Sequence, residues 1–162
     1  MSEPILEQIA ATVVQRLGEI TKANGFQFDA ESVVRVNRDA TDWTPRHLSI
    51  LVVQGEEVEN PELSHPGNPP GIAYDVGFNI HGFVRHSDRE TVTSAITENQ
   101  MIASIKKSIT NSHDWHNFGG LAIDAQWNDK PFESNENDHE GATVGIVITY
   151  RISERDPYVV RV

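Results

Sequence analysis

The chain has 162 residues, of which 38% are hydrophobic, and this suffices for one domain, 1–162, with a core of its own. Its 24 acidic and 13 basic residues give a formal net charge of -11 at pH 7, which disfavours binding to nucleic-acid phosphates. The lack of cysteine excludes disulfides, thiol catalysis and thiolate zinc sites, and no signal peptide or membrane-length apolar run is readable, so we expect no membrane association.

An amphipathic helix is predicted for residues 3–24. Ser2 can cap its start, and Asn24-Gly25 offers a left-handed stop. Spacings of three and four residues place the apolar positions on one stripe, typical of a helix that covers a core. The stripe consists of Ile5, Leu6, Ile9, Ala10, Val13, Leu17 and Ile20.

Two strands are predicted next, over residues 31–37 and 46–54. Both faces of the second are fairly apolar, which indicates a central place in the sheet. Residues 55–70 contain four Glu, four Pro and two Asn, and this composition predicts a long acidic loop. Loops of this length are uncommon unless they contact something or lack order.

A long strand over residues 71–85 organises the predicted sheet. Alternate positions are apolar, while the other register is mostly small or polar, so one face should form a wall of the core. The strand is longer than usual and can project beyond its own sheet. The residues expected on the core face are Ile72, Tyr74, Val76, Phe78, Ile80 and Val84.

The remaining elements complete a two-layer α+β domain. The capping box Ser87-Asp88-Arg89-Glu90 predicts the start of a second helix that ends near Thr110. Strands follow over residues 121–127 and 142–152, paired as a hairpin across an acidic loop at 128–140, and residues 153–162 form an extended, apolar tail. We therefore expect an antiparallel or mixed sheet of about five strands with two helices on one face.

Signals for catalysis are weak. There is no phosphate-binding glycine loop and no strand-to-helix nucleophile turn. The best metal candidate is His113 with His116 and His139, which would suit a small metal-assisted hydrolase, although the same pair can simply sit near a helix end in a polar turn. Asp75 and Asp124 could face one another on neighbouring strands. We expect no enzyme activity and no cofactor.

Features of assembly are more prominent. Exposed strand edges and extended tails are common devices for pairing between subunits. The tail must dock either on its own domain or on a neighbour, and the acidic loops also permit an alternative, a protein-binding module for a basic partner. The candidate interface residues are Glu56, Glu57, Glu59, Tyr158, Val159 and Val160.

The run Val147-Ile148-Thr149-Tyr150-Arg151, followed by Asp156-Pro157-Tyr158, resembles the bacteriophage tail terminator family, also called tail completion or minor tail proteins. The order of predicted elements is similar along the whole chain. No individual residue role can be carried over from the family.

The resemblance implies a structural protein without a catalytic site or cofactor. Its subunits would form a ring, typically of about six, that sits on the last ring of the tail tube, ends tube polymerisation and offers a surface to the head or neck. The implied partners are further copies of the chain, the tail tube protein, a head-completion or neck protein and, in a contractile tail, a sheath protein. DNA would pass the acidic lumen without specific binding. The implied location is the head-proximal end of the virion tail, and the host cytoplasm during assembly.

Overall fold

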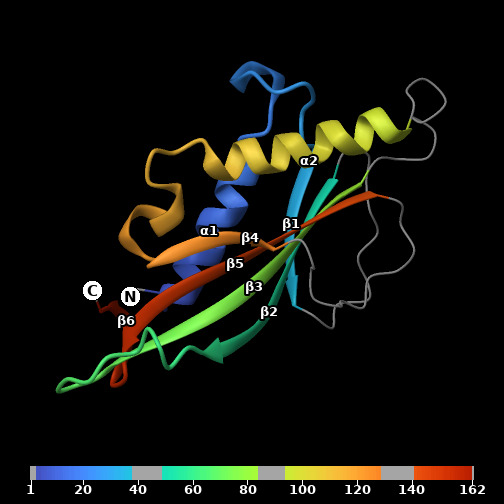
Figure 1. The fold of residues 1–162 in the computed structure, drawn as a ribbon. Coiled ribbons are helices and arrows are strands. Elements are labelled where there is room, and N and C mark those ends of the chain that lie inside the picture. The colour runs from blue at the N-terminus through green and yellow to red at the C-terminus, as the bar shows by residue number, and fades with distance from the viewer. Residues whose placement is uncertain (1–2, 38–48, 84–93, 129–140, 162) are drawn as a thin grey trace.

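The computed structural model describes residues 3–37, 49–83, 94–128 and 141–161, and these form a curled mixed sheet with helices packed on one face, as Figure 1 shows. This is the α+β class expected from the sequence. No helix within those ranges is long and apolar enough to cross a membrane. The helical elements are α1 (Ile5–Gly18), η1 (Lys22–Asn24), α2 (Ser94–Thr110) and η3 (Trp115–Gly120). The strands are β1 (Ser32–Asn37), β2 (Ser49–Glu59), β3 (Gly71–Phe83), β4 (Asp124–Asn128), β5 (Gly141–Ser153) and β6 (Asp156–Val160).

The sheet has six strands in the order β1-β2-β3-β5-β4, and β6 pairs with β5 outside this path. Strands β1 and β2 run parallel, whereas the other neighbours are antiparallel, so the sheet is mixed. The predicted central place of β2 is confirmed, as is the antiparallel pairing of the fourth and fifth strands.

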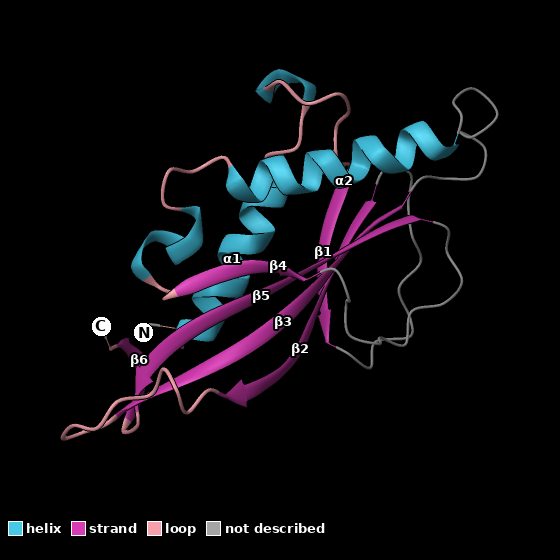
Figure 2. Cartoon of the chain, in the orientation of Figure 1, coloured by secondary structure: helices cyan, strands magenta, loops and turns pink. Residues whose placement is uncertain are grey.

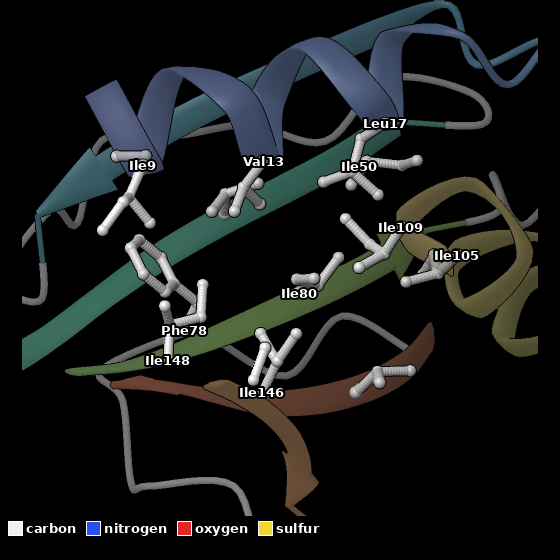
Figure 3. Packing of buried hydrophobic residues seen from close by; sticks show 14 of the residues in the cluster. Ile9, Val13, Leu17, Ile50, Phe78, Ile80, Ile105, Ile109, Ile146 and Ile148 are labelled. Atoms are coloured by element: carbon white, nitrogen blue, oxygen red, sulfur yellow. The ribbon is translucent and has the colours of Figure 1, made fainter. Parts of the chain in front are cut away.

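The main core lies between the helices and one face of the sheet. Residues of α1 point toward the buried register of the central strands (Figure 3), and α2 adds Met101, Ile105 and Ile109 from the side. The register therefore matches the alternation read from the sequence of β3, where Val76, Phe78 and Ile80 are fully buried. Val84, also predicted for this face, lies outside the described residues.

The other face of the sheet is also buried at one end. Leu51, Val53 and Phe83 form a second, smaller cluster, with Val34 and Val36 packed against it. Beside it, the polar residues Asn79 and His81 are buried as well, and His81 Nδ1 lies 2.9 Å from Thr143 Oγ1. The small and polar side chains of β3 are thus largely buried at this end of the sheet.

Several predicted boundaries are wrong in position. The first helix ends at Gly18 instead of residue 24, because the chain there turns into η1, whose Thr21 side chain accepts a hydrogen bond from Asn24 N and whose exit is Gly25 at φ 86°. Ile20 stays buried although it has left the helix. The Asn24-Gly25 stop therefore belongs to η1. Ser2 lies outside the described residues, and Pro4 takes the N-cap position of α1.

Two other boundaries differ from expectation. Strand β2 continues to Glu59 instead of ending at residue 54, because a bulge between Gln54 and Glu57 carries pairing with β3 past the glycine. The segment 111–120 contains the turn η3, and β4 accordingly begins at Asp124 instead of residue 121. The capping box at 87–90 lies outside the described residues.

Arg35 fastens the first helix to the edge of the sheet. Its Nη1 and Nη2 atoms donate to the Glu7 carboxylate at 2.7 and 2.8 Å, and Nη2 also donates to Gln54 Oε1 at 2.6 Å. The hydrogen bond from Arg35 holds the pKa of Glu7 below its usual value. The ion pair therefore stabilises the fold fully at pH values above the ordinary pKa of glutamate. This stabilisation is lost as the pH falls through the lowered pKa of Glu7.

Gly82 is required where β3 passes under α2. A Cβ atom built there would collide with Met101 Cγ and lie 2.7 Å from Met101 Sδ, and Met101 is 1% exposed. We expect Gly82→Ala to lower the free energy of unfolding by about 1–3 kcal/mol through overpacking, measured by urea denaturation. The control is Gly18→Ala, where nothing lies within 4 Å of the added atom. Equal stabilities of these two variants would contradict the close packing of β3 on α2.

Candidate protein interface

The sheet extends past α2 at one end, where α1 still contacts β6. In Figure 2 the strands β2, β3 and β5 run toward the loop of residues 60–70, away from α2. We call residues 55–76 and 149–161 the projecting end. Here β1 no longer pairs with β2, since their last pair is Asn37 with Gln54, and β4 pairs with β5 no further than Thr149. The strand order at the projecting end is therefore β2-β3-β5-β6.

The loop of residues 60–70 closes on its own base. His65 and Gly71 exchange backbone hydrogen bonds of 2.9 and 3.0 Å, and Ser64 Oγ accepts from Ala73 N at 2.9 Å. Asn60 N also donates to Ala73 O at 2.8 Å. Composition alone predicted a long loop over residues 55–70, but the irregular part is shorter and is tied to β3 by backbone bonds.

Two arginines clamp this loop onto β5 and the tail. Arg151 Nε donates to Leu63 O at 2.7 Å, and Arg161 Nη2 donates to Pro69 O at 2.8 Å. Glu154 N adds a bond of 2.9 Å to Pro70 O. The tail therefore docks on its own domain, one of the two alternatives left open by the sequence. The clamps hold the loop, the β5–β6 turn and the tail in one arrangement.

The outer side of β2 is an edge of the described sheet at the projecting end. Because Asn60 N donates to β3, antiparallel alternation turns the backbone groups of Glu57 and Glu59 away from β3. No described strand pairs with residues 55–59 on that side. Such an edge is a ready template for another chain.

Exposed apolar side chains gather at the same end. Five large hydrophobic side chains are exposed among the residues that the structure describes, and only Ile123 lies elsewhere. Concentrated exposure of this kind marks a docking surface more often than scattered exposure does. The four at the projecting end are Val58 (62%), Leu63 (37%), Tyr158 (45%) and Val159 (46%).

The candidate interface residues divide between the two sides of the projecting end. Glu56, Glu57 and Glu59 lie on the exposed part of β2, and Tyr158 and Val159 lie on β6, across β3 and β5. Val160, by contrast, is partly buried against the main core. The tail therefore contributes one residue to packing and two to the surface.

Negative charge from β2 and from the β5–β6 turn gathers around Tyr74 at the projecting end. Partial burial raises the pKa of the Glu57 carboxyl. Burial also raises the pKa of the Tyr74 hydroxyl, and the nearby charges of Glu57, Glu59 and Glu154 raise it further. These carboxylates therefore act on a common region of the surface, which would favour a cationic group from a partner.

The histidines form no metal site within the part of the chain that the structure describes. His113 is exposed, and His116 Nδ1 lies 3.7 Å from Asp124 Oδ1 with its ring against Trp115 at 3.8 Å between centroids. No group of three or more potential ligands gathers within the described ranges, and His139 falls outside them. The hydrolase hypothesis thus gains no support from His113 and His116, and its third residue stays a prediction.

The predicted carboxylate pair is separated by a strand. Asp75 on β3 and Asp124 on β4 both lie opposite Thr149 of β5, one on each side of it. Asp75 accepts hydrogen bonds from Thr149 Oγ1 at 2.5 Å and from Asn60 Nδ2 at 3.1 Å. Asp75 therefore has a structural role at the base of the projecting end.

A shallow hollow of about 410 Å³ lies between the exit of η1 and α2, lined in part by Asn99 and Ser104. Lys107 at its rim donates to Gly25 O at 3.2 Å and lies 4.7 Å above the Phe26 ring. Its charge is thus already engaged by the protein, and the hollow carries no arrangement suited to a particular ligand.

Sequence reasoning did not foresee the parts played by Val58, Leu63 and the arginines of the last strands. A signal was present, because Arg151, Arg155 and Arg161 are concentrated in a chain with few basic residues.

Comparison with known proteins found no family model that matches the chain and no curated protein that matches it. The function proposed below therefore rests on the resemblance of the last strand and the tail to the terminator family, together with the surfaces described above.

Proposed function

We propose that this chain is a structural virion protein of a bacteriophage tail, a terminator whose subunits form a ring on the end of the tail tube. The ring, of about six subunits, would stop tube polymerisation and provide the interface for a head-completion or neck protein. In a contractile tail a sheath protein would be a further partner. The proposal includes no catalytic activity and no cofactor, and it locates the protein in the virion tail.

The observation that carries this proposal is the projecting end of the sheet. Its two lateral sides differ, with an acidic edge on β2 that no described strand covers and an exposed apolar turn and tail on β6. Unlike surfaces on opposite sides of a subunit suit heterologous contacts, and these close into rings about a cyclic axis. A symmetric dimer would instead use one self-complementary patch.

The net charge of the chain is compatible with DNA passing through the ring, as the resemblance implies. The net charge of -11 gives the ring a surface that does not hold passing DNA, since affinity for the phosphate backbone comes from clustered Lys and Arg. A DNA conduit needs this property. The lumen itself would be lined by surfaces other than those buried between subunits.

The test is a reconstitution with the tail tube protein of the same phage. We expect the purified chain to form closed rings with a central hole, either alone or on tube ends, seen by light scattering and negative-stain electron microscopy. Adding it to polymerising tube protein should shorten the tubes in proportion to its concentration. Uncapped tubes of unchanged length, together with a monomer at every concentration, would overturn the proposal. Stoichiometric bound zinc would instead support the hydrolase alternative.

A further inference from the structure

We infer that the acidic edge of β2 on one copy binds the tail turn of β6 on the next copy. The acidic edge is residues 55–59, and the tail turn is residues 155–159. This inference rests on the proposed function, since it names the two surfaces that meet between neighbouring subunits of the ring.

The two surfaces cannot meet within one chain. β3 pairs with β5 along the whole length of both strands, from Gly71 opposite Ser153 to Phe83 opposite Gly141. β2 therefore lies on the far side of β3, and β6 lies on the far side of β5. The two surfaces therefore lie on opposite sides of the sheet, and no strand within the described ranges covers either of them.

The two surfaces are complementary in charge. The acidic edge carries Glu57 and Glu59, both exposed, whereas the tail turn carries the exposed cation Arg155, next to Asp156, whose Oδ1 accepts a hydrogen bond from Tyr158 N. A guanidinium group forms strong, paired hydrogen bonds with a carboxylate. Like charges would meet if two acidic edges were brought together, so self-pairing of this edge is disfavoured.

The two surfaces also match in apolar character. Val58 is 62% exposed on the acidic edge, and Tyr158 and Val159 are 45% and 46% exposed on the tail turn. Contact between them would remove from water three of the most exposed large apolar side chains that the structure describes. Tyrosine at the centre of a contact is a frequent source of binding energy.

The geometry of β6 shows which kind of contact to expect. The pairing with β5 shifts between Ile152 opposite Val160 and Ser153 opposite Asp156, so residues 157–159 bulge out of the ladder. Pro157 has no N–H, and the Tyr158 N–H already donates to Asp156 Oδ1 at 3.0 Å. The tail turn therefore offers side chains, and it would dock on the acidic edge without extending the sheet as a regular added strand.

Both surfaces are held in place before binding. The clamp from Arg161 to Pro69 O and the bond from Glu154 to Pro70 O join the tail to the loop that follows β2. Preorganisation of this kind lowers the entropy lost on association. The contact thus brings together two fixed surfaces.

The experiment uses two variants of the full chain. The edge variant carries Glu57→Lys and Glu59→Lys, and the tail variant carries Arg155→Ser and Tyr158→Ser. Each alone should remain folded by circular dichroism but associate at least about tenfold more weakly than the wild type, with no rings in solution or on tube ends. A control with the same charge change, Glu19→Lys with Glu31→Lys, alters exposed residues outside both surfaces and should form rings as the wild type does.

Mixing the two variants tests the pairing itself. The edge variant keeps an intact tail turn and the tail variant keeps an intact acidic edge, so a 1:1 mixture should give a heterodimer and nothing larger, seen by light scattering. The reciprocal exchange in one chain, Glu57→Arg with Arg155→Glu, should restore rings, in solution or on tube ends. Rings formed by either variant alone, or no rings from the exchange variant while the wild type forms rings, would overturn this inference and leave the proposed function standing. Failure of the wild type to assemble at all would overturn both.

Discussion

Replacing Phe78 with alanine should lower the free energy of unfolding by about 3–5 kcal/mol, the usual cost of removing a fully buried phenylalanine. Phe78 is 0% exposed and lies at the centre of the helix-facing side of β3, between Ile148 and the stripe of α1 (Figure 3). Neighbours held in strands and a helix cannot move far enough to fill the cavity. Urea denaturation followed by circular dichroism would measure the change.

The matched control is Val58→Thr, on the neighbouring strand. Val58 is 62% exposed, and the substitution keeps the β-branched shape, so stability should change by no more than about 0.5 kcal/mol. A large loss for this variant, or a small one for Phe78→Ala, would mean that the register of β2 and β3 differs from the one described.

The local pattern of the sequence was enough to predict most of the elements. The helix stripe of α1 and the alternation of β3 and β5 depend only on residue spacing, and the structure places these stripes against one another. The spacing could not predict where β2 ends. Its alternation breaks at Gly55, and pairing resumes only because a bulge absorbs the shift. Bulges depend on the partner strand, which a single stretch of sequence does not reveal.

The candidate interface was predicted in part. The acidic run and the apolar tail were selected from composition, and the structure places them on opposite sides of the projecting end. The hydrogen bonds from Arg151 to Leu63 O and from Arg161 to Pro69 O join residues that are 88 and 92 positions apart in the sequence. No local pattern encodes such contacts. The parallel pairing of β1 with β2 was likewise left undecided, since β-branched runs suit either direction.

Removing residues 156–162 should show what the tail contributes to the stability of the domain and what it contributes to ring assembly. The truncated chain loses the packing of Val160 on the core, the bond from Arg161 N to Arg151 O and the clamp on Pro69 O. We expect a folded domain that is less stable by about 2–3 kcal/mol, from one partly buried valine and a few hydrogen bonds. Amide exchange at His65 and Gly71 should speed up, because the loop loses one of its clamps. Rings should no longer form, in solution or on tube ends.

A second variant shows whether lost assembly follows from lost packing or from a lost surface. Tyr158→Ser with Val159→Ser changes only exposed side chains of the tail and keeps Val160 and Arg161, so stability should stay within about 0.5 kcal/mol of the wild type. Association should still weaken, because the apolar part of the tail turn is gone. If this variant and the truncated chain both assembled as the wild type does, the tail would serve only to close the edge of β5, and the subunit contact would have to use another surface.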